Sequence, residues 1–542
     1  MLAFVVFING MCIMVLEMAG ARLMAPVFGT SVVVWTSLIG VILGSLSVGY
    51  WLGGRLGDKC LNESGEPRAA PNPKQKIRLL ESQQQALEKA KKTLALLLTL
   101  ASASVLVAVG LSFYLPDFFA THIPSFHIGS VLAAISLFVL PSLLCGMISS
   151  FAIRMGITDK NSSGQTIGKL YALSTIGSIL GTFLGGFLLI AWLGTIAILF
   201  AVAACLLICA LAVKAKPLLP KFMILLIILG ATSAHIQYSA WVLERGFPEQ
   251  GVPIRFDTAY SSARISASAF DGIDSIFLMT DHITCQSGMS KSDPAGLLFK
   301  YTRFYSMGPL FNPEATRVLV LGGGGYSLPK WLLAGRSPLH GSEFELDVVE
   351  LDPVLTAIAG TYFQTPLDDP RLTVYHEDAR TFLNRKSADA NGTYGIILAD
   401  LFNTRYTVPF QVTTREAAEH IYALLDQDGV FVMNVISALD GEQGQMLHAV
   451  RNALLESFEQ VYIFPVDLPE DNTSVQNIIL LAFKTEQSLP ATSEFTSEPE
   501  YAKMLSQQWQ NGFSESILNT PALSDDYAPV ERYAMDYVQL AM

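Results

Sequence analysis

The chain has 542 residues and a formal net charge of −12 at pH 7. That charge, together with the lack of a basic stripe interleaved with aromatic residues, excludes a nucleic-acid partner. Hydrophobic residues make up 51% of the chain and charged residues only 15%, whereas an ordinary soluble protein carries about 25% charged residues. The apolar excess lies almost wholly before residue 242, so the first half predicts a membrane domain and the second half a soluble one.

Seven apolar segments are long enough, or nearly so, to cross about 30 Å of hydrocarbon. The first is too long for a cleavable signal peptide and has no basic leader. We therefore predict an α-helical transmembrane bundle of about seven spans over residues 1–242. The expected spans are 2–24, 32–54, 93–115, 129–153, 166–190, 193–213 and 222–241.

Small and polar residues stand out within these spans. Glycines recur at the spacing that lets helices approach closely, and we interpret them as packing positions. Glu17 and Arg22 lie inside the first span, where burying either charge alone is costly. Either they form a structural ion pair or they mark a polar substrate path, and the sequence leaves both open. The glycines are Gly40, Gly44, Gly49 and Gly53, and later Gly177, Gly181 and Gly185.

The cysteines give no sign of a metal site. Four of the six lie in apolar spans, where a thiol serves as a small hydrophobic group, so we expect neither metal ligands nor disulfides. The six are Cys12, Cys60, Cys145, Cys205, Cys209 and Cys285.

The basic residues predict the orientation of the bundle. Segment 55–92 is rich in Lys and Arg, and connector 116–128 has neither. The positive-inside rule then places the N-terminus in the cytoplasm of a bacterial-type inner membrane. Seven full crossings would put the soluble half outside. Because segment 222–241 carries His235 and Gln237 and is the weakest span, we favour a cytoplasmic soluble half.

The soluble half reads as two parts. Short alternating runs and turn formers such as Asp271–Gly272 predict a small β-meander with a connecting helix over residues 250–312. From residue 313 to 542, strands alternate with amphipathic helices, which predicts a doubly wound, mostly parallel, Rossmann-like α/β domain. The expected strands of that sheet are 317–322, 345–350, 372–375, 394–400, 429–435, 459–465 and 477–484.

A nucleoside site is expected at the carboxyl ends of these strands. The first strand stops at a glycine turn that includes Gly322, Gly323 and Gly324, and the second ends in Glu350. Glycines let the backbone approach a ligand, and an acid at the next strand tip can hold a pair of ribose hydroxyls. Asp378 and Asp400 follow two further strands, so four features fall at one edge of the sheet.

These motifs resemble the spermidine synthase family, within the class I methyltransferase-like fold. The stretches LVLGGGGYSLPKWLL, VVELDP, HEDARTFL, ADLFN and DDYAPVE carry the resemblance in the soluble half. Together with GYWLGGRLGDK and GKLYALSTIGSILGTFLGGFLL in the membrane half, they make the whole chain similar to membrane-fused spermidine-synthase-like proteins, also described as transporter/synthase fusions.

The resemblance implies roles for single residues. Glu350 matches the acid that holds the ribose of decarboxylated S-adenosylmethionine, and Asp378, with Ala379 beside it, matches the acid that reads the adenine. Asp400 matches the catalytic aspartate that helps to deprotonate the attacking amine. Gln286 and Tyr301 fall near positions that line the donor and amine site, where Tyr301 could orient the nucleophile. From the residues alone, Asp378 could equally be a helix N-cap.

The departures from the family are as informative. Gly325 stands where the family has an Asp, Asn403 where it has a second acid, and Arg303 where it has a Glu. A doubly charged diamine needs carboxylate partners once it is desolvated, so we expect the amine half of the site to be altered. Asp525, Asp526 and Glu531 could supply an alternative anionic wall or could be surface acids.

Three functions follow from this resemblance. The first is an aminopropyltransferase-like enzyme that uses decarboxylated S-adenosylmethionine or S-adenosylmethionine as co-substrate, with no permanently bound cofactor. The second is a methyltransferase or sulfonium-cleaving enzyme, and the third is a non-catalytic nucleoside sensor or a polyamine transport-coupled protein. The expected partners are a small amine or other acceptor and the lipid bilayer. A homodimer stays open.

Overall fold

The computed structural model describes most of the chain, and by internal contacts that chain forms two compact units. The first comprises Met1–Arg245 with Asp257–Ser261, and the second Gly246–Phe256 with Ser262–Met542. The described residues are 1–28, 32–61, 73–157, 163–244, 253–258, 260–280, 285–339, 343–389, 392–402, 409–468, 471–530 and 532–534.

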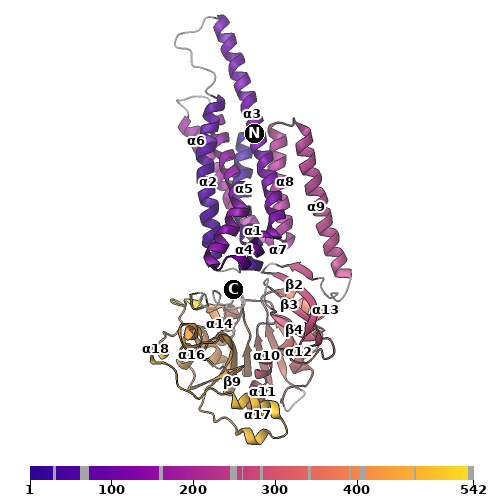
Figure 1. Cartoon of the computed structure of the whole chain (residues 1–542), viewed down its shortest axis with the longest axis vertical. Coiled ribbons are helices and arrows are strands. Elements are labelled where there is room, and N and C mark those ends of the chain that lie inside the picture. Colours follow the sequence, from indigo (N-terminus) through magenta and orange to yellow (C-terminus); the bar gives the residue numbers. More distant parts are fainter. Residues whose placement is uncertain are drawn as a thin grey trace. The chain divides into compact units, whose positions relative to one another are not determined.

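The first unit is entirely helical in its long elements (Figure 1). Six of its helices are long and apolar enough to cross a membrane, over Leu2–Ala25, Val32–Leu61, Leu80–Ser112, Phe126–Gly156, Ser163–Leu189 and Thr195–Val213. The helices are α1 (Leu2–Phe28), α2 (Val32–Leu61), α3 (Pro73–Ser112), α4 (Leu115–His122), α5 (Phe126–Gly156), α6 (Ser163–Phe183), the π-helix η2 (Leu184–Leu189), α7 (Ile190–Leu193), α8 (Thr195–Val213) and α9 (Leu218–Glu244).

The prediction of about seven spans is corrected to six within the described residues. The seventh segment does form a helix, α9, but its described apolar part, Leu218–Ala234, is shorter than the other six. The polar residues that follow it interrupt the apolar run, which is the reason the segment was already the weakest of the seven. The bundle prediction itself is confirmed.

Glycines do pack these helices, but only on some faces. A Cβ on Gly49 or Gly53 of α2 would collide with backbone oxygens of α5, and one on Gly177 or Gly181 of α6 would collide with those of α1. These glycines therefore let two helix backbones touch, as predicted. Gly40 and Gly44 are different, since a Cβ on either would meet nothing within 4 Å. For those two positions the packing prediction is wrong.

Polar side chains of the bundle bond between helices. Asn9 is fully buried and donates to the carbonyl oxygen of Cys145, at 2.9 Å, and to Oγ of Ser149, at 2.8 Å. Arg22 donates from Nη2 to the carbonyl oxygen of Thr258, at 2.8 Å, within the same unit. Buried polar groups of a membrane helix need such partners, because no water is available to replace them.

The second unit begins with a four-stranded sheet in the order β1-β2-β3-β4. The strands are β1 (Ile254–Asp257), β2 (Ser262–Phe270), β3 (Ile273–Met279) and β4 (Ser287–Ser290). β2 and β3 pair antiparallel around a two-residue turn in which Asp271 and Gly272 both have positive φ, at 49° and 78°. A turn of that kind matches the twist of a hairpin, and the predicted meander is confirmed.

A seven-stranded sheet follows, in the order β10-β11-β9-β8-β5-β6-β7. Neighbours from β9 to β7 pair in parallel, and β11 runs antiparallel to both β9 and β10. The mostly parallel Rossmann-like sheet that the sequence predicts is therefore present. Its strands are β5 (Arg317–Leu321), β6 (Glu345–Val349), β7 (Leu372–Tyr375), β8 (Tyr394–Ala399), β9 (Leu425–Ser437), β10 (Gln460–Pro465) and β11 (Gln476–Phe483).

Helices cover both faces of this sheet, as alternating strand–helix connections require. One buried cluster joins strand residues to α14 (Ala379–Asp389), α15 (Arg415–Leu424) and α16 (Gln445–Leu455). The other joins the opposite side chains to α10 (Lys300–Phe304), α11 (Met307–Phe311), α12 (Ser327–Leu333), α13 (Pro353–Tyr362) and α17 (Pro499–Ser506). The short helices η3 (Phe410–Val412), η4 (Glu442–Gly444), η5 (Thr492–Phe495) and α18 (Glu515–Leu518) complete the unit.

Candidate active site

The ends of three adjacent strands meet at the centre of the large sheet. β5 lies between β6 and β8, and the chain leaves it in opposite directions on the two sides. The Gly322 amide donates to the carbonyl oxygen of Val349 at the end of β6, at 2.9 Å. On the other side, the Asp400 amide donates to the carbonyl oxygen of Leu321, at 3.0 Å. Ligands of open α/β sheets bind at such a switch point.

The glycine turn and Glu350 are joined directly. Glu350 Oε2 accepts hydrogen bonds from the amides of Gly323 and Gly324, both at 2.9 Å, and Oε1 accepts from the amide of Asp352, at 2.9 Å. Gly322 and Gly324 have φ of +93° and +51°, a region that only glycine enters freely. Burial raises the pKa of Glu350, while the three amides act in the opposite direction. The carboxylate is thus fixed at the strand tip.

Asp400 lies next to the same turn and is bonded by Tyr301. A Cβ on Gly322 would collide with the carbonyl oxygen of Asp400, so only glycine allows this approach. Tyr301 donates its hydroxyl to Asp400 Oδ2, at 3.2 Å. Asp400 Oδ1 is buried and accepts no hydrogen bond from the described residues, although the residue as a whole is partly exposed. The structure therefore brings Tyr301, Asp400, the glycines and Glu350 together.

Desolvation tunes the charge state of Asp400. It raises the pKa of the carboxyl to about 6, although hydrogen bonds from Tyr301, Asn434 and Tyr305 pull the pKa down. A carboxylate with a pKa near the working pH can take a proton from a reacting group. Burial, and then the negative charge of Asp400, raises the pKa of Tyr301 well above its ordinary value, so that this hydroxyl stays a donor.

Two residues around Asp400 escaped the sequence reasoning. Tyr305 donates its hydroxyl to the carbonyl oxygen of Ala399, at 2.6 Å, and accepts from the amide of Asn434, at 3.1 Å. Both side chains are buried. The signals were present: Tyr305 follows Tyr301 by four residues, one helical turn, and Asn434 is a polar residue inside the apolar strand β9.

The other expected ligands flank this centre. Gln286 Oε1 is buried without a partner among the described residues, and the next residue, Ser287, accepts from the amide of Gly325 through Oγ, at 2.9 Å. Asp378 is exposed and accepts from the amide of Thr381 at Oδ1, at 3.0 Å. Asp378 is thus the N-cap of α14, with Ala379 buried behind it. It follows β7, one strand beyond Glu350.

The residues that depart from the family do not add charge to the site. A Cβ on Gly325 would lie 2.7 Å from Cβ of Ser287, so a larger side chain has no room there. Arg303 pairs with Glu500, at 3.2 Å, and donates to the carbonyl oxygen of Leu297. Asp525 is paired with Arg380, at 2.7 Å. Asn403 and Glu531 lie outside the described residues.

No metal is needed to explain these groups. Over the part of the chain that the structure describes, no three His, Cys, Asp or Glu side chains gather as metal ligands would. The acceptors that remain unpaired, Asp400 Oδ1 and Gln286 Oε1, would instead suit a ligand that brings hydrogen-bond donors.

Comparison with known proteins covers the same half of the chain. Residues 299–488 match the family model described as spermine/spermidine synthase domain. A polyamine aminopropyltransferase of Vibrio vulnificus is 32% identical over 200 residues, which are 36% of this chain and 62% of that protein. A second, from Streptococcus uberis, is 28% identical over 165 residues, 29% of this chain and 53% of that protein. The chain thus spans less than two thirds of these relatives.

Solved structures also resemble the chain at low identity. A probable spermidine synthase of Corynebacterium glutamicum has a TM-score of 0.40 and 20% identity, covering 52% of this chain and 98% of that one. A spermidine synthase in complex with the transition-state analogue AdoDATO has a TM-score of 0.33 and 18% identity, covering 50% and 85%. The C-terminal half of this chain therefore carries a spermine/spermidine synthase domain, distantly homologous to polyamine aminopropyltransferases and preceded by six long apolar helices.

Proposed function

We propose that the soluble unit binds an adenosyl sulfonium donor, either decarboxylated S-adenosylmethionine or S-adenosylmethionine, and transfers an alkyl group to an acceptor. The observation that carries this proposal is Asp400, a carboxylate with a pKa of about 6, a free buried oxygen and a tyrosine partner, at the strand end beside the glycine turn. Glu350 would hold the ribose hydroxyls, and Asp378 and Gln286 would contact the rest of the donor.

Asp400 would act as general base in this transfer. The acceptor nitrogen attacks the carbon bonded to sulfur, the carbon–sulfur bond breaks, and its electron pair stays on sulfur as the neutral thioether leaves. The proton of the nitrogen passes to Asp400, while Tyr301 holds Oδ2 and leaves Oδ1 to receive it. The chain then needs only to align the two reactants and remove one proton.

The acceptor would differ from a diamine. Ser287 fills the space beside Gly325, Arg303 is directed to Glu500, and Asp525 is neutralised by Arg380. Asp400 is then the carboxylate that these described residues leave for an ammonium group. We propose an acceptor with one amine or a weakly charged nucleophile, because a second buried ammonium would lack a counter-charge.

Product analysis tests the proposal. The full chain in detergent is incubated with each donor and a panel of monoamines and diamines. Methylthioadenosine release with an alkylated monoamine supports aminopropyl transfer, and S-adenosylhomocysteine would instead show methyl transfer. Methylthioadenosine without an alkylated product would show sulfonium cleavage. Binding of the donor with no turnover on any acceptor would leave a sensor, and no binding at all would refute the proposal.

The side of the membrane stays a prediction. With the N-terminus in the cytoplasm, six crossings return the chain to the cytoplasm, where nucleoside donors are found. A seventh crossing by α9 would put the soluble unit outside. The Arg22–Thr258 hydrogen bond favours that alternative, because Arg22 lies near the end of α1 remote from the basic connectors. Cys285 is exposed and the other five cysteines are buried or half-buried, so an impermeant maleimide applied to intact cells distinguishes the two.

A further inference from the structure

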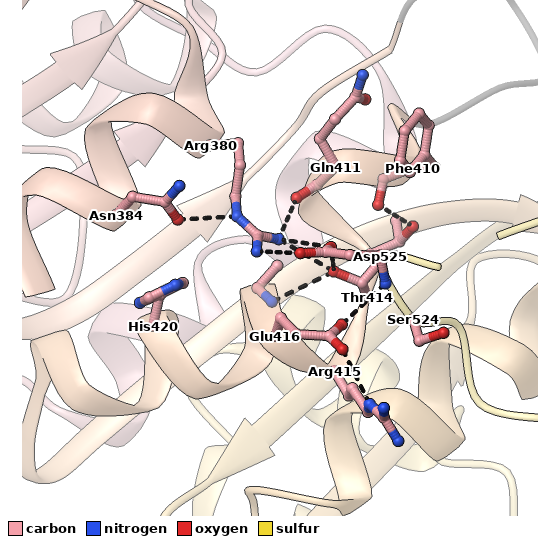
Figure 2. Close-up of polar contacts among 12 residues, drawn as sticks. Arg380, Asn384, Phe410, Gln411, Thr414, Arg415, Glu416, His420, Ser524 and Asp525 are labelled. Atoms are coloured by element: carbon pink, nitrogen blue, oxygen red, sulfur yellow. Dashed lines mark hydrogen bonds and ion pairs between the residues drawn. The ribbon is translucent and has the colours of Figure 1, made fainter. Parts of the chain in front are cut away.

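A dense polar cluster lies beside the candidate site, where it joins three segments far apart in the chain (Figure 2). At its centre is Arg380, the second residue of α14, whose side chain is 14% exposed. Its Nη1 and Nη2 pair with the two carboxylate oxygens of Asp525, at 3.2 and 2.7 Å. Nη1 also donates to the carbonyl oxygen of Gln411 and to Oγ1 of Thr414, at 2.9 and 3.0 Å, and Nε donates to Asn384, at 2.8 Å. We call these residues the Arg380 cluster.

The partners of Arg380 are also bonded to one another. Thr414 is the N-cap of α15 and donates Oγ1 to Asp525 Oδ1, at 2.8 Å. The amide of Asp525 donates to Glu416 Oε2, at 3.0 Å, and the amide of Arg415 donates to the carbonyl oxygen of Leu523, at 2.9 Å. The segment around Asp525 is therefore fastened to the first turn of α15 by both backbone and side-chain bonds.

These bonds connect the two halves of the candidate site. Arg380 lies two residues after Asp378, the acid expected to read the adenine. Gln411 and Thr414 lie at the end of the connection that leaves β8 at Asp400, the expected general base. The Arg380 fork thus holds the far end of that connection against the first turn of the donor-side helix.

The geometry of the fork matters more here than its charge. Asp525 is 46% exposed, so solvent screens the ion pair and its Coulomb term is small. A guanidinium, however, can satisfy two carboxylate oxygens, a carbonyl and a hydroxyl at once in one plane, which an ammonium group cannot reproduce. A change that keeps the charge but loses the fork should therefore loosen the connection.

We propose that Arg380, paired with Asp525, is a positioning residue that holds the Asp400–α15 connection in register with the donor-binding end of α14. The proposal rests on the function proposed above for the same site. It assigns the DDYAPVE segment a mechanical role in place of the anionic wall that the sequence left open.

The test compares R380K and D525N with a matched control, R385Q, in the full chain. Arg385 lies one turn further along α14 and pairs with the exposed side of Glu377, away from the cluster. For R380K and D525N we expect the KM for the sulfonium donor, and the Kd for methylthioadenosine, to rise about tenfold, with kcat changed less than twofold. R385Q should leave all three unchanged.

Amide hydrogen exchange supplies a readout that does not depend on activity. In R380K and D525N the amides of residues 409–414 should exchange at least tenfold faster than in the wild type, while those of β5 and β6 keep their rates. Unchanged exchange in 409–414 would overturn the proposal, and so would faster exchange with an unchanged Kd for methylthioadenosine. If the wild-type chain binds no adenosyl compound, the proposed function fails, whereas the exchange rates still report whether Arg380 holds the connection.

Discussion

Replacing Asp400 by Asn should stabilise the protein while it abolishes turnover. Burial raises the pKa of this carboxyl from about 3.9 in an unfolded chain to about 6. Above pH 6 the group is ionised in both states, and keeping it ionised in the folded state costs up to about 3 kcal/mol. Asn has a similar shape, keeps an acceptor for Tyr301, and carries no charge to desolvate.

The pH dependence follows from the sign of this shift. A carboxyl whose pKa is raised on folding binds its proton more tightly in the folded state, so its contribution favours folding below about pH 4 and is lost between about pH 4 and pH 6. The advantage of the Asn variant should therefore be greatest at pH 7 to 8 and should vanish near pH 4. For a unit of about 290 residues, up to about 3 kcal/mol corresponds to roughly 5 °C in the melting temperature.

The measurement is thermal unfolding of the detergent-solubilised chain, wild type and D400N, from pH 4 to pH 8. Calorimetric titration with methylthioadenosine on the same samples should give a Kd within about twofold of the wild type. A D400N protein that melts lower than the wild type at pH 7.5 would refute the burial argument. Loss of donor affinity with a preserved rate would show that Asp400 binds the donor and is not the base.

Three other predictions concern separate parts of the chain. The pH profile of kcat/KM should rise with an acid limb near pH 6 as Asp400 loses its proton, and a limb near pH 4 would place the base elsewhere. Glu350→Ala should weaken binding of methylthioadenosine by roughly 1–3 kcal/mol in calorimetry, as for a lost charged hydrogen bond, and an unchanged Kd would remove Glu350 from the site. Gly177→Val should lower the melting temperature of the helical unit, because its side chain would collide with the backbone of Phe7, whereas Gly168→Val, which faces open space, should not; equal effects would contradict the packing argument.

The sheet and its ligand edge were predictable because their signals are local. Each strand is an apolar run bounded by turn residues, and the groups at the strand ends are next to those runs in sequence. Gly322, Glu350 and Asp400 therefore fell at one edge before any contact was known, and the structure brings them within hydrogen-bonding distance of common atoms.

What remained hidden depends on contacts between distant segments. The sequence does not tell which face of α2 meets α5, so Gly40 could not be told from Gly49. It also does not reveal that Arg380 neutralises Asp525, 145 residues away. Asn434 looked like an isolated polar residue until β9 was placed beside Tyr305.

The bond between Glu350 and the glycine turn has a consequence for ligand choice. In dinucleotide-binding proteins the amides of such a turn receive a pyrophosphate. Here the amides of Gly323 and Gly324 already serve a carboxylate of the chain itself. A phosphorylated nucleotide would have to displace that carboxylate and then lie against its negative charge, so this edge of the sheet rejects coenzymes such as NAD or ATP and leaves room for an unphosphorylated, positively charged nucleoside.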